Sequence, residues 1–153
     1  DIQLAFIATD AANGEKVVLD KGDLATAVMA STCIPGIFNP IEINNKMLVD
    51  GGIVENVPVI TLSELGADYT IGVDLNSNHR YQKPSNILDI ILNSFHFIMM
   101  QSSFQQTKKA DFLIKPDLSE FNRTDINQIN KLMQKGYNEA RTALNKIKHP
   151  GKA

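Results

Sequence analysis

The first fifty residues carry short apolar blocks separated by turn-forming dipeptides, a pattern that predicts β-strands. Asn13-Gly14 accepts positive φ and turns the chain tightly, so the blocks on either side of it are expected to pair as a hairpin. Asn44-Asn45 separates a second pair in the same way. The four predicted strands are residues 2–9, 16–19, 41–43 and 47–49.

Apolar positions that recur at helical spacing predict four helices. Asp23 is expected to cap a short helix that runs to Ser31, and Pro58 pre-sets the φ of a helical first turn. Ser85 or Asn86 is expected to cap a long helix, and Thr124 a final one whose apolar positions fit a period of about 3.6 residues. The predicted helices cover about residues 24–31, 59–65, 87–109 and 125–147.

Two further strands, residues 69–75 and 111–115, alternate with these helices. Strands that alternate with helices imply a largely parallel sheet covered by helices. We therefore predict an α/β fold. The length of 153 residues suits one domain, residues 1–153, with a single core and no internal repeat.

The segment of residues 87–100 is apolar on nearly all sides, because ten of its fourteen residues are Ile, Leu, Phe or Met. It is shorter than the about 20 residues that a membrane-spanning helix needs, and Asp89, Asn93 and His96 interrupt it. Such a helix is either buried or docked against something beyond the chain. We interpret it as core, with a lipid-facing or subunit-facing surface as the alternative, and His96 as a core histidine rather than a ligand.

Composition and charge narrow the function classes. A formal charge of −2 gives no reason to expect nucleic acid as a partner. One cysteine, Cys33, cannot build a disulfide framework, so a reducing compartment, taken as the cytoplasm, is expected. Cys33 itself is interpreted as a small buried residue rather than a nucleophile. No metal or organic cofactor is expected, because no cluster of His, Cys and carboxylates has ligand spacing.

The strongest chemical signal is Asp50-Gly51-Gly52, directly after the fourth predicted strand. Glycines lack a Cβ, so the backbone can turn sharply there and another group can approach closely. A carboxylate held at a strand end on such a loop suits a general base. The same tripeptide is also an ordinary turn, so these residues alone leave the catalytic reading open.

Several short motifs, in order along the chain, resemble the patatin-like phospholipase and acylesterase family. The resemblance covers nearly the whole chain and is densest from residue 7 to residue 74. It implies a three-layer α/β sheet covered by helices, of which residues 1–153 are expected to be the C-terminal part of a single catalytic domain. The motifs include Ala8-Thr9-Asp10, Ile34-Pro35-Gly36, Leu48-Val49-Asp50-Gly51-Gly52, Leu65-Gly66-Ala67-Asp68 and Ile71-Gly72-Val73-Asp74.

The resemblance also implies lipid acyl ester hydrolysis by a serine–aspartate dyad. In the family the serine lies upstream, in a Gly-x-Ser-x-Gly turn between a strand and a helix, and the aspartate takes its proton directly. Carried over to this sequence, Asp50 is the base, and Gly51 and Gly52 shape its loop. The implied substrate is a fatty-acyl ester or lysophospholipid, with no cofactor. No residue is assigned to substrate binding.

The sequence departs from the family pattern at the nucleophile. No Gly-x-Ser-x-Gly and no Gly-Gly-Gly loop occur in these 153 residues, and Ser31 ends a predicted helix instead of opening one. We therefore expect this chain to supply the aspartate, with a missing N-terminal segment supplying the nucleophile. Apolar surface is then expected to be left open along residues 2–7 and 87–100. Homo-oligomerisation and peripheral membrane contact stay open.

The sequence leaves two other function classes to compare. A non-catalytic α/β binding or interaction module that kept the fold without the nucleophile is the main alternative. A nucleotide-binding domain is discounted, because the sequence has neither Gly-x-Gly-x-x-Gly nor Gly-x-x-x-x-Gly-Lys-[Ser/Thr].

Overall fold

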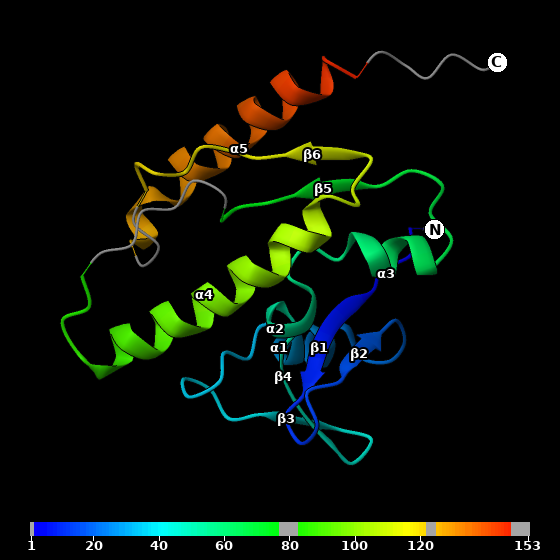
Figure 1. Cartoon of the computed structure of the whole chain (residues 1–153), viewed down its shortest axis with the longest axis vertical. Helices are drawn as coiled ribbons and strands as arrows, with labels where there is room; N and C mark the ends of the chain where they lie inside the picture. Colours follow the sequence, from blue (N-terminus) through cyan, green and yellow to red (C-terminus); the bar gives the residue numbers. More distant parts are fainter. Residues whose placement is uncertain (1, 77–82, 122–124, 148–153) are drawn as a thin grey trace.

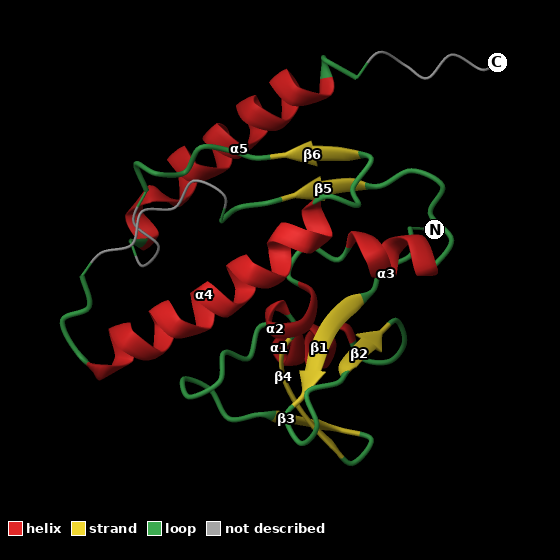
Figure 2. Ribbon diagram, in the orientation of Figure 1, coloured by secondary structure: helices red, strands yellow, loops and turns green. Residues whose placement is uncertain are grey.

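A computed structural model describes residues 2–76, 83–121 and 125–147 (Figures 1 and 2). Its N-terminal part is built on a four-stranded sheet in the order β2-β1-β4-β3, with every pairing antiparallel. Both predicted hairpins are confirmed. Asn44 and Asn45 have φ of 52° and 61°, the left-handed conformation that a tight two-residue turn requires. Gly14, with a φ of 76°, lies in the longer loop between Asp10 and Lys16. The strands are β1 (Phe6–Asp10), β2 (Lys16–Leu19), β3 (Ile41–Ile43) and β4 (Lys46–Asp50).

Helix α1 (Leu24–Ser31) packs on this sheet. It begins as predicted, because the side chain of Asp23 accepts the backbone N–H of Thr26 at 2.7 Å and so satisfies one of the free donors of the first turn. The small core lies between α1 and the two central strands, where Ala8, Ala30 and Leu48 are fully buried.

Two short helices follow the sheet. Helix α2 (Gly52–Glu55) begins two residues after the end of β4, and α3 (Val59–Glu64) follows Pro58 as predicted. Helix α2 was not predicted, because four residues are too few to show a helical period and no side chain caps its first turn.

The C-terminal part contains β5 (Ile71–Val73) and β6 (Phe112–Ile114), which pair in parallel. Helix α4 (Ile87–Thr107) connects them, and Asn86 caps it by accepting the N–H of Asp89 at 2.9 Å. A 3-10 turn, η1 (Ile126–Gln128), leads into α5 (Ile129–Leu144), which contacts β6. The predicted cap Thr124 and most of the predicted polar loop, residues 77–82, lie outside the described residues.

Two expectations about the strands need correction. In the described residues the sheets are not largely parallel. Every pairing among β1 to β4 is antiparallel, and β5 with β6 is the one parallel strand pair there. The first strand also starts later than predicted: residues 2–5 lie outside it, and Ile2 is 91% exposed. An apolar run therefore does not by itself make a strand. The α/β class holds, and the three-layer arrangement stays a prediction.

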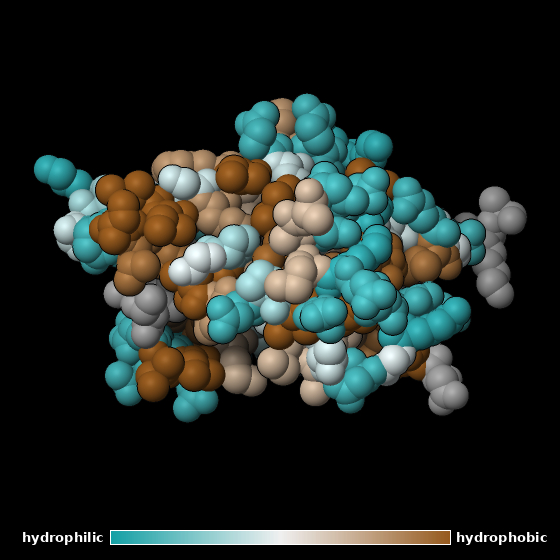
Figure 3. All heavy atoms as spheres, turned by 90° about the horizontal axis from the view of Figure 1, so that it is seen from below, coloured by the Kyte–Doolittle hydropathy of each residue, from teal (hydrophilic) through white to brown (hydrophobic). Residues whose placement is uncertain are grey.

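The burial predicted for residues 87–100 is wrong. Phe95 is the one buried residue of that segment, whereas Ile87, Phe97 and Ile98 are more than half exposed. In the described part of the chain α4 is also the one helix whose length and composition would allow it to cross a membrane, a test that core helices pass as well. The face in Figure 3 accordingly shows clusters of hydrophobic residues among polar ones.

Candidate active site

Asp50 is the last residue of β4, opposite Ala8 of β1. Its peptide groups are held on both sides: its N–H donates to the carbonyl of Cys33 at 2.9 Å, and its carbonyl accepts the hydroxyl of Thr9 at 2.9 Å. One carboxylate oxygen, Oδ1, accepts the N–H of Gly52 at 2.7 Å. Within the described residues nothing else donates to this carboxylate, so Oδ2 is left to receive a proton from elsewhere.

Burial raises the pKa of the Asp50 carboxyl above its ordinary value of 3.8, and the hydrogen bond from Gly52 offsets part of that effect. The direction suits a general base, because a carboxylate with a higher pKa holds an abstracted proton more firmly. A half-buried carboxylate at a rigid strand end can therefore take a proton from a hydroxyl brought to it.

Cys33 is buried next to this site, as expected for a small core residue. Its Sγ donates to the carbonyl of Asn39 at 3.1 Å. Burial raises the pKa of the Cys33 thiol, and the negative charge of Asp50 raises it further. The thiol is therefore neutral at physiological pH, the opposite of what a nucleophilic cysteine needs.

The two loop glycines are needed for space rather than for unusual backbone angles. Gly51 has φ −73° and ψ −15°, and neither glycine has positive φ. A Cβ at Gly51 would overlap the backbone carbonyl of Ile7 in β1. A Cβ at Gly52 would run into the end of the Met99 side chain from α4 and lie 3.1 Å from Oδ1 of Asp50. The groups that approach are thus β1 and α4.

An ion pair between buried Glu55 and the partly exposed Lys16, which could not be predicted from the sequence, fixes the helices after Asp50. Glu55, only 5% exposed, ends α2. Its Oε1 accepts the N–H groups of Ile60 and Thr61 at 3.1 and 3.0 Å. Its Oε2 accepts the hydroxyl of Thr61 at 2.6 Å and the ammonium of Lys16 at 3.0 Å. One carboxylate therefore ties α2 to the first turn of α3 and to β2.

Each member of this pair stabilises the charged form of the other. Burial alone would raise the pKa of Glu55, but the hydrogen bonds from Thr61 and Lys16 outweigh it and hold that pKa below its ordinary 4.5. Burial would lower the pKa of Lys16, but Glu55 and Glu64 outweigh it and raise that pKa above 10.5. Both groups are therefore charged at neutral pH. No local signal could reveal the pair, since 39 residues separate its members.

Helix α4 is fastened to α2 by polar side chains in its C-terminal half. Gln106 accepts the N–H of Val57 at 3.1 Å and donates to the carbonyl of Val54 at 3.0 Å. Asn56 donates to the hydroxyl of Ser103 at 2.6 Å. These bonds hold the helix that carries Met99 against the residues after Asp50.

Two other sequence candidates, Ser31 and His96, make structural contacts. Ser31 is the last residue of α1, as predicted, and its carbonyl accepts the N–H of Gly51 at 3.4 Å. His96 is half-buried on α4 with Nε2 3.0 Å from Oδ1 of Asn76. A histidine with an amide partner fits the interpretation as a satisfied residue of the fold.

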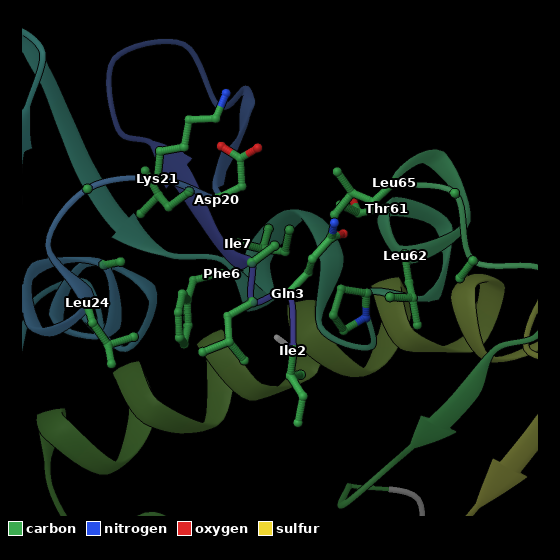
Figure 4. Close-up of a pocket in the computed structure, with 18 of the residues that line it drawn as sticks. Ile2, Gln3, Phe6, Ile7, Asp20, Lys21, Leu24, Thr61, Leu62 and Leu65 are labelled. Carbon is green, nitrogen blue, oxygen red and sulfur yellow. The ribbon is translucent and has the colours of Figure 1, made fainter.

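A groove of about 910 Å³ lies between residues 2–7, the start of α1 and α3 (Figure 4). Its walls are largely apolar, with Phe6, Leu24 and Leu62 among them. Asp50 is not part of its lining, so the groove supplies no chemistry of its own to the base.

Residues 2–63 match the family model described as patatin-like phospholipase, and this region contains Asp50 with both of its glycines. This part of the chain, residues 2–63, is patatin-like. The matched part of this patatin-like chain runs from the segment before β1 nearly to the end of α3.

Relatives of known name agree with this assignment. An uncharacterised NTE family protein of Mycobacterium tuberculosis is 39% identical over 77 residues, which are 50% of this chain and 21% of the relative. Another from the same organism is 23% identical over 163 aligned residues, 90% of this chain and 28% of the relative. A protein named lysophospholipase NTE1 from Meyerozyma guilliermondii is 34% identical over 70 residues, 46% of this chain and 5% of the relative. The patatin-like chain thus spans under a third of each relative's length.

Proposed function

We propose that this chain is the aspartate-bearing part of a lipid acyl hydrolase that uses a serine–aspartate dyad, with a fatty-acyl ester or lysophospholipid as substrate. The observation that carries the proposal is Asp50: a carboxylate of raised pKa, fixed at a strand end with one oxygen bonded and the other open. The match of residues 2–63 to the patatin-like phospholipase model and the likeness to a protein named lysophospholipase support the substrate class.

The proposed chemistry has two steps. Oδ2 of Asp50 takes the proton of a serine hydroxyl as its oxygen attacks the ester carbonyl carbon, and the departing alcohol then receives that proton. Water next attacks the acyl-serine ester, gives a proton to Asp50, and releases the fatty acid as the proton returns to the serine. The serine and the donors for the oxyanion belong to the missing N-terminal segment, because these 153 residues hold no Gly-x-Ser-x-Gly.

The test is Asp50→Asn in the protein that includes the nucleophile segment. Asparagine keeps the size of the side chain and the bond from Gly52 but cannot take up a proton, so kcat for a p-nitrophenyl acyl ester should fall by about 10²–10⁴. Asp10→Asn is the matched control, since Asp10 is also a buried carboxylate at the end of a central strand. It should leave kcat near that of the wild type.

Near wild-type kcat for Asp50→Asn would contradict the assignment and favour a non-catalytic binding module. A second measurement treats the 153-residue chain with a fluorogenic phosphonate probe. No serine should be labelled, because a base without its nucleophile cannot form the covalent adduct. Stoichiometric labelling of a serine in this chain would show that the nucleophile lies within it.

A further inference from the structure

Helix α5 carries an apolar stripe that the described part of the chain leaves uncovered. Ile129, Met133, Tyr137 and Leu144 lie along one face of the helix, because residues four or seven positions apart share a face. None of the four is buried, and Met133 and Tyr137 are 69% and 62% exposed. We call these four residues the α5 stripe.

A different face of α5 packs on the rest of the fold. The helix contacts β6 and lies at the outside of the molecule beyond that strand (Figure 1). Its half-buried residues include Gly136, Glu139 and Ala143, which lie about a quarter of a turn around the helix from the α5 stripe. The contact that holds α5 in place therefore leaves the stripe open.

The polar side of α5 is basic, although the whole chain has a formal charge of −2. Between residues 126 and 147 the basic residues are Lys131, Lys135, Arg141 and Lys146, and the one acidic residue is Glu139. Glu139 is paired with Lys135 at 3.0 Å, which neutralises one charge of each sign. The other three basic residues leave a positive surplus on this helix.

An apolar stripe combined with a basic polar side is typical of a helix that lies in the plane of a membrane surface. The apolar side chains enter the boundary of the acyl chains, and the cations meet anionic headgroups. A tyrosine suits this boundary, because its ring is apolar and its hydroxyl stays in contact with water. Helix α4 also exposes apolar residues but holds no Lys or Arg between Ile87 and Thr107, so this charge argument applies to α5 and not to α4.

We propose that α5 docks this protein on anionic lipid surfaces, with the α5 stripe at the boundary of headgroups and acyl chains and with Lys131, Arg141 and Lys146 near the lipid phosphates. The choice of lipid also rests on the proposed function, since long-chain lipid esters are held in membranes and other aggregates. A partner protein is the competing occupant. It would explain the α5 stripe but not the surplus of basic residues.

Vesicle flotation tests the docking in the protein that includes the nucleophile segment. The wild type should bind vesicles of phosphatidylcholine with about one third phosphatidylglycerol at least about tenfold more tightly than vesicles of phosphatidylcholine alone. Met133→Gln should weaken binding to the mixed vesicles about tenfold, because it removes apolar surface from the α5 stripe. Thr142→Gln is the matched control: Thr142 is exposed on the opposite face of α5, so this variant should bind like the wild type.

Two further measurements separate charge from insertion. Lys131→Gln combined with Arg141→Gln should weaken binding to the mixed vesicles about 25-fold at low salt, since each basic residue near such a surface contributes about fivefold. Added salt should weaken the binding of the wild type in the same direction. In the 153-residue chain, which contains no tryptophan, the emission of Tyr137→Trp should move to shorter wavelength on the mixed vesicles as the ring leaves water.

Equal binding to neutral and anionic vesicles, an unshifted emission of Tyr137→Trp, or a Met133→Gln variant that floats like the wild type would each overturn the proposal. The last result would mean that protein, and not lipid, covers the α5 stripe.

Ester hydrolysis separates this proposal from the proposed function. A protein that binds the mixed vesicles through α5 but hydrolyses no ester would support the docking helix and contradict the acyl hydrolase. A protein that hydrolyses a soluble p-nitrophenyl ester but does not bind the mixed vesicles would contradict the docking helix alone.

Discussion

At the scale of single residues, the Asp50 carboxylate is partly buried, so less water is available to stabilise its negative charge. The backbone on both sides is hydrogen-bonded, so the side chain cannot move far to recover solvent. A folded-state pKa above the ordinary value means that the folded chain binds the proton more tightly than the unfolded chain does. The ionised carboxylate therefore lowers the stability of the fold.

This sign gives a prediction for Asp50→Asn. Below the ordinary carboxyl value of 3.8 the wild type and the variant should unfold at the same temperature. As pH rises from there through the raised pKa, the wild type should lose stability relative to the variant, so Asp50→Asn should have the higher Tm at pH 7. Thermal unfolding followed by circular dichroism between pH 3 and pH 8 measures this.

Asp10→Asn is again the control and should bring no gain, because the charge of Asp10 has the ammonium of Lys46 3.8 Å away. A wild type that is as stable as Asp50→Asn at pH 7 would show that the carboxylate is adequately solvated.

The two glycines after Asp50 should differ in their tolerance of a methyl group. In Gly51→Ala the Cβ meets the backbone of β1, which cannot shift without breaking the sheet, so a loss of about 2–4 kcal/mol in the free energy of unfolding is expected. In Gly52→Ala it meets the flexible end of Met99, so about 1 kcal/mol is expected. Urea unfolding of both variants measures the difference, and equal losses would rule out β1 as the constraint.

Short-range residue roles could be predicted from the sequence, and long-range roles could not. The caps Asp23 and Asn86 act within three residues, so the local pattern is enough to find them. The reason for Gly51 lies at Ile7, 44 positions earlier in the sequence, and only the fold brings them together. The role of Glu55 could not be predicted for the same reason, because a glutamate is expected at the surface until its partners are known.

At the scale of elements, the pair of Glu55 and Lys16 is the joint between β2, α2 and α3. Three of the four bonds to the Glu55 carboxylate come from the first turn of α3. Only the bond from Lys16 reaches across to the sheet. The Lys16 ammonium also bonds Thr61 and Glu64, so it links β2 to both helices.

Lys16→Met should cost about 1–3 kcal/mol in the free energy of unfolding, because it leaves a buried carboxylate without its countercharge. Glu64→Gln is the matched control: Glu64 also pairs with Lys16, at 3.2 Å, but is exposed, so at most about 0.5 kcal/mol should be lost. Chemical denaturation at pH 7 compares the two variants. Equal, small losses would mean that water replaces the ammonium at no cost.

The lowered pKa of Glu55 adds a pH dependence. Its contribution is present above the ordinary carboxyl value of 4.5 and is lost as pH falls through the lower, folded-state pKa. Glu55→Gln should therefore be less stable than the wild type at pH 7 and approach it in acid, the reverse of the trend expected for Asp50→Asn.

The local patterns predicted most elements but not how they meet. Five of the six strands keep their predicted cores, and α4 ends within two residues of the expected Lys109. The largely parallel sheet was wrong because the order of elements does not say that β1 pairs with β4 in antiparallel. The prediction that α4 is buried was wrong because an apolar sequence indicates that some surface covers the helix. It does not indicate whether that surface belongs to the same chain.

At the scale of the whole molecule, apolar surface is exposed along the two segments where it was expected. Ile2 and Leu4 of the N-terminal segment are exposed, and exposed apolar residues occur along most of the length of α4. Monomeric proteins rarely leave contiguous patches beyond a few hundred Å² uncovered. The sequence therefore predicts that such surface exists, but only the fold shows which residues form it.

The 153-residue chain on its own should therefore self-associate as its concentration rises. Replacing Phe97 and Ile98, both more than half exposed on α4, by Gln should lower the average mass at a given concentration. Ser94→Gln on the same helix changes a polar exposed residue and serves as the control. Sedimentation velocity over a concentration series measures the effect, and a monomer at all concentrations would remove the role given to this surface.

The connectivity of the two sheets has a consequence for synthesis. Strands β1 to β4 lie within the first fifty residues, and both of their hairpins close over a few residues, whereas β5 and β6 are joined across a contact 41 residues long in sequence. Short loops close faster and at lower entropic cost than long ones. As the chain leaves the ribosome, the sheet that orients Asp50 can therefore form before β6 has been translated. Asp50 is then in place while β5 still has no paired strand on either side.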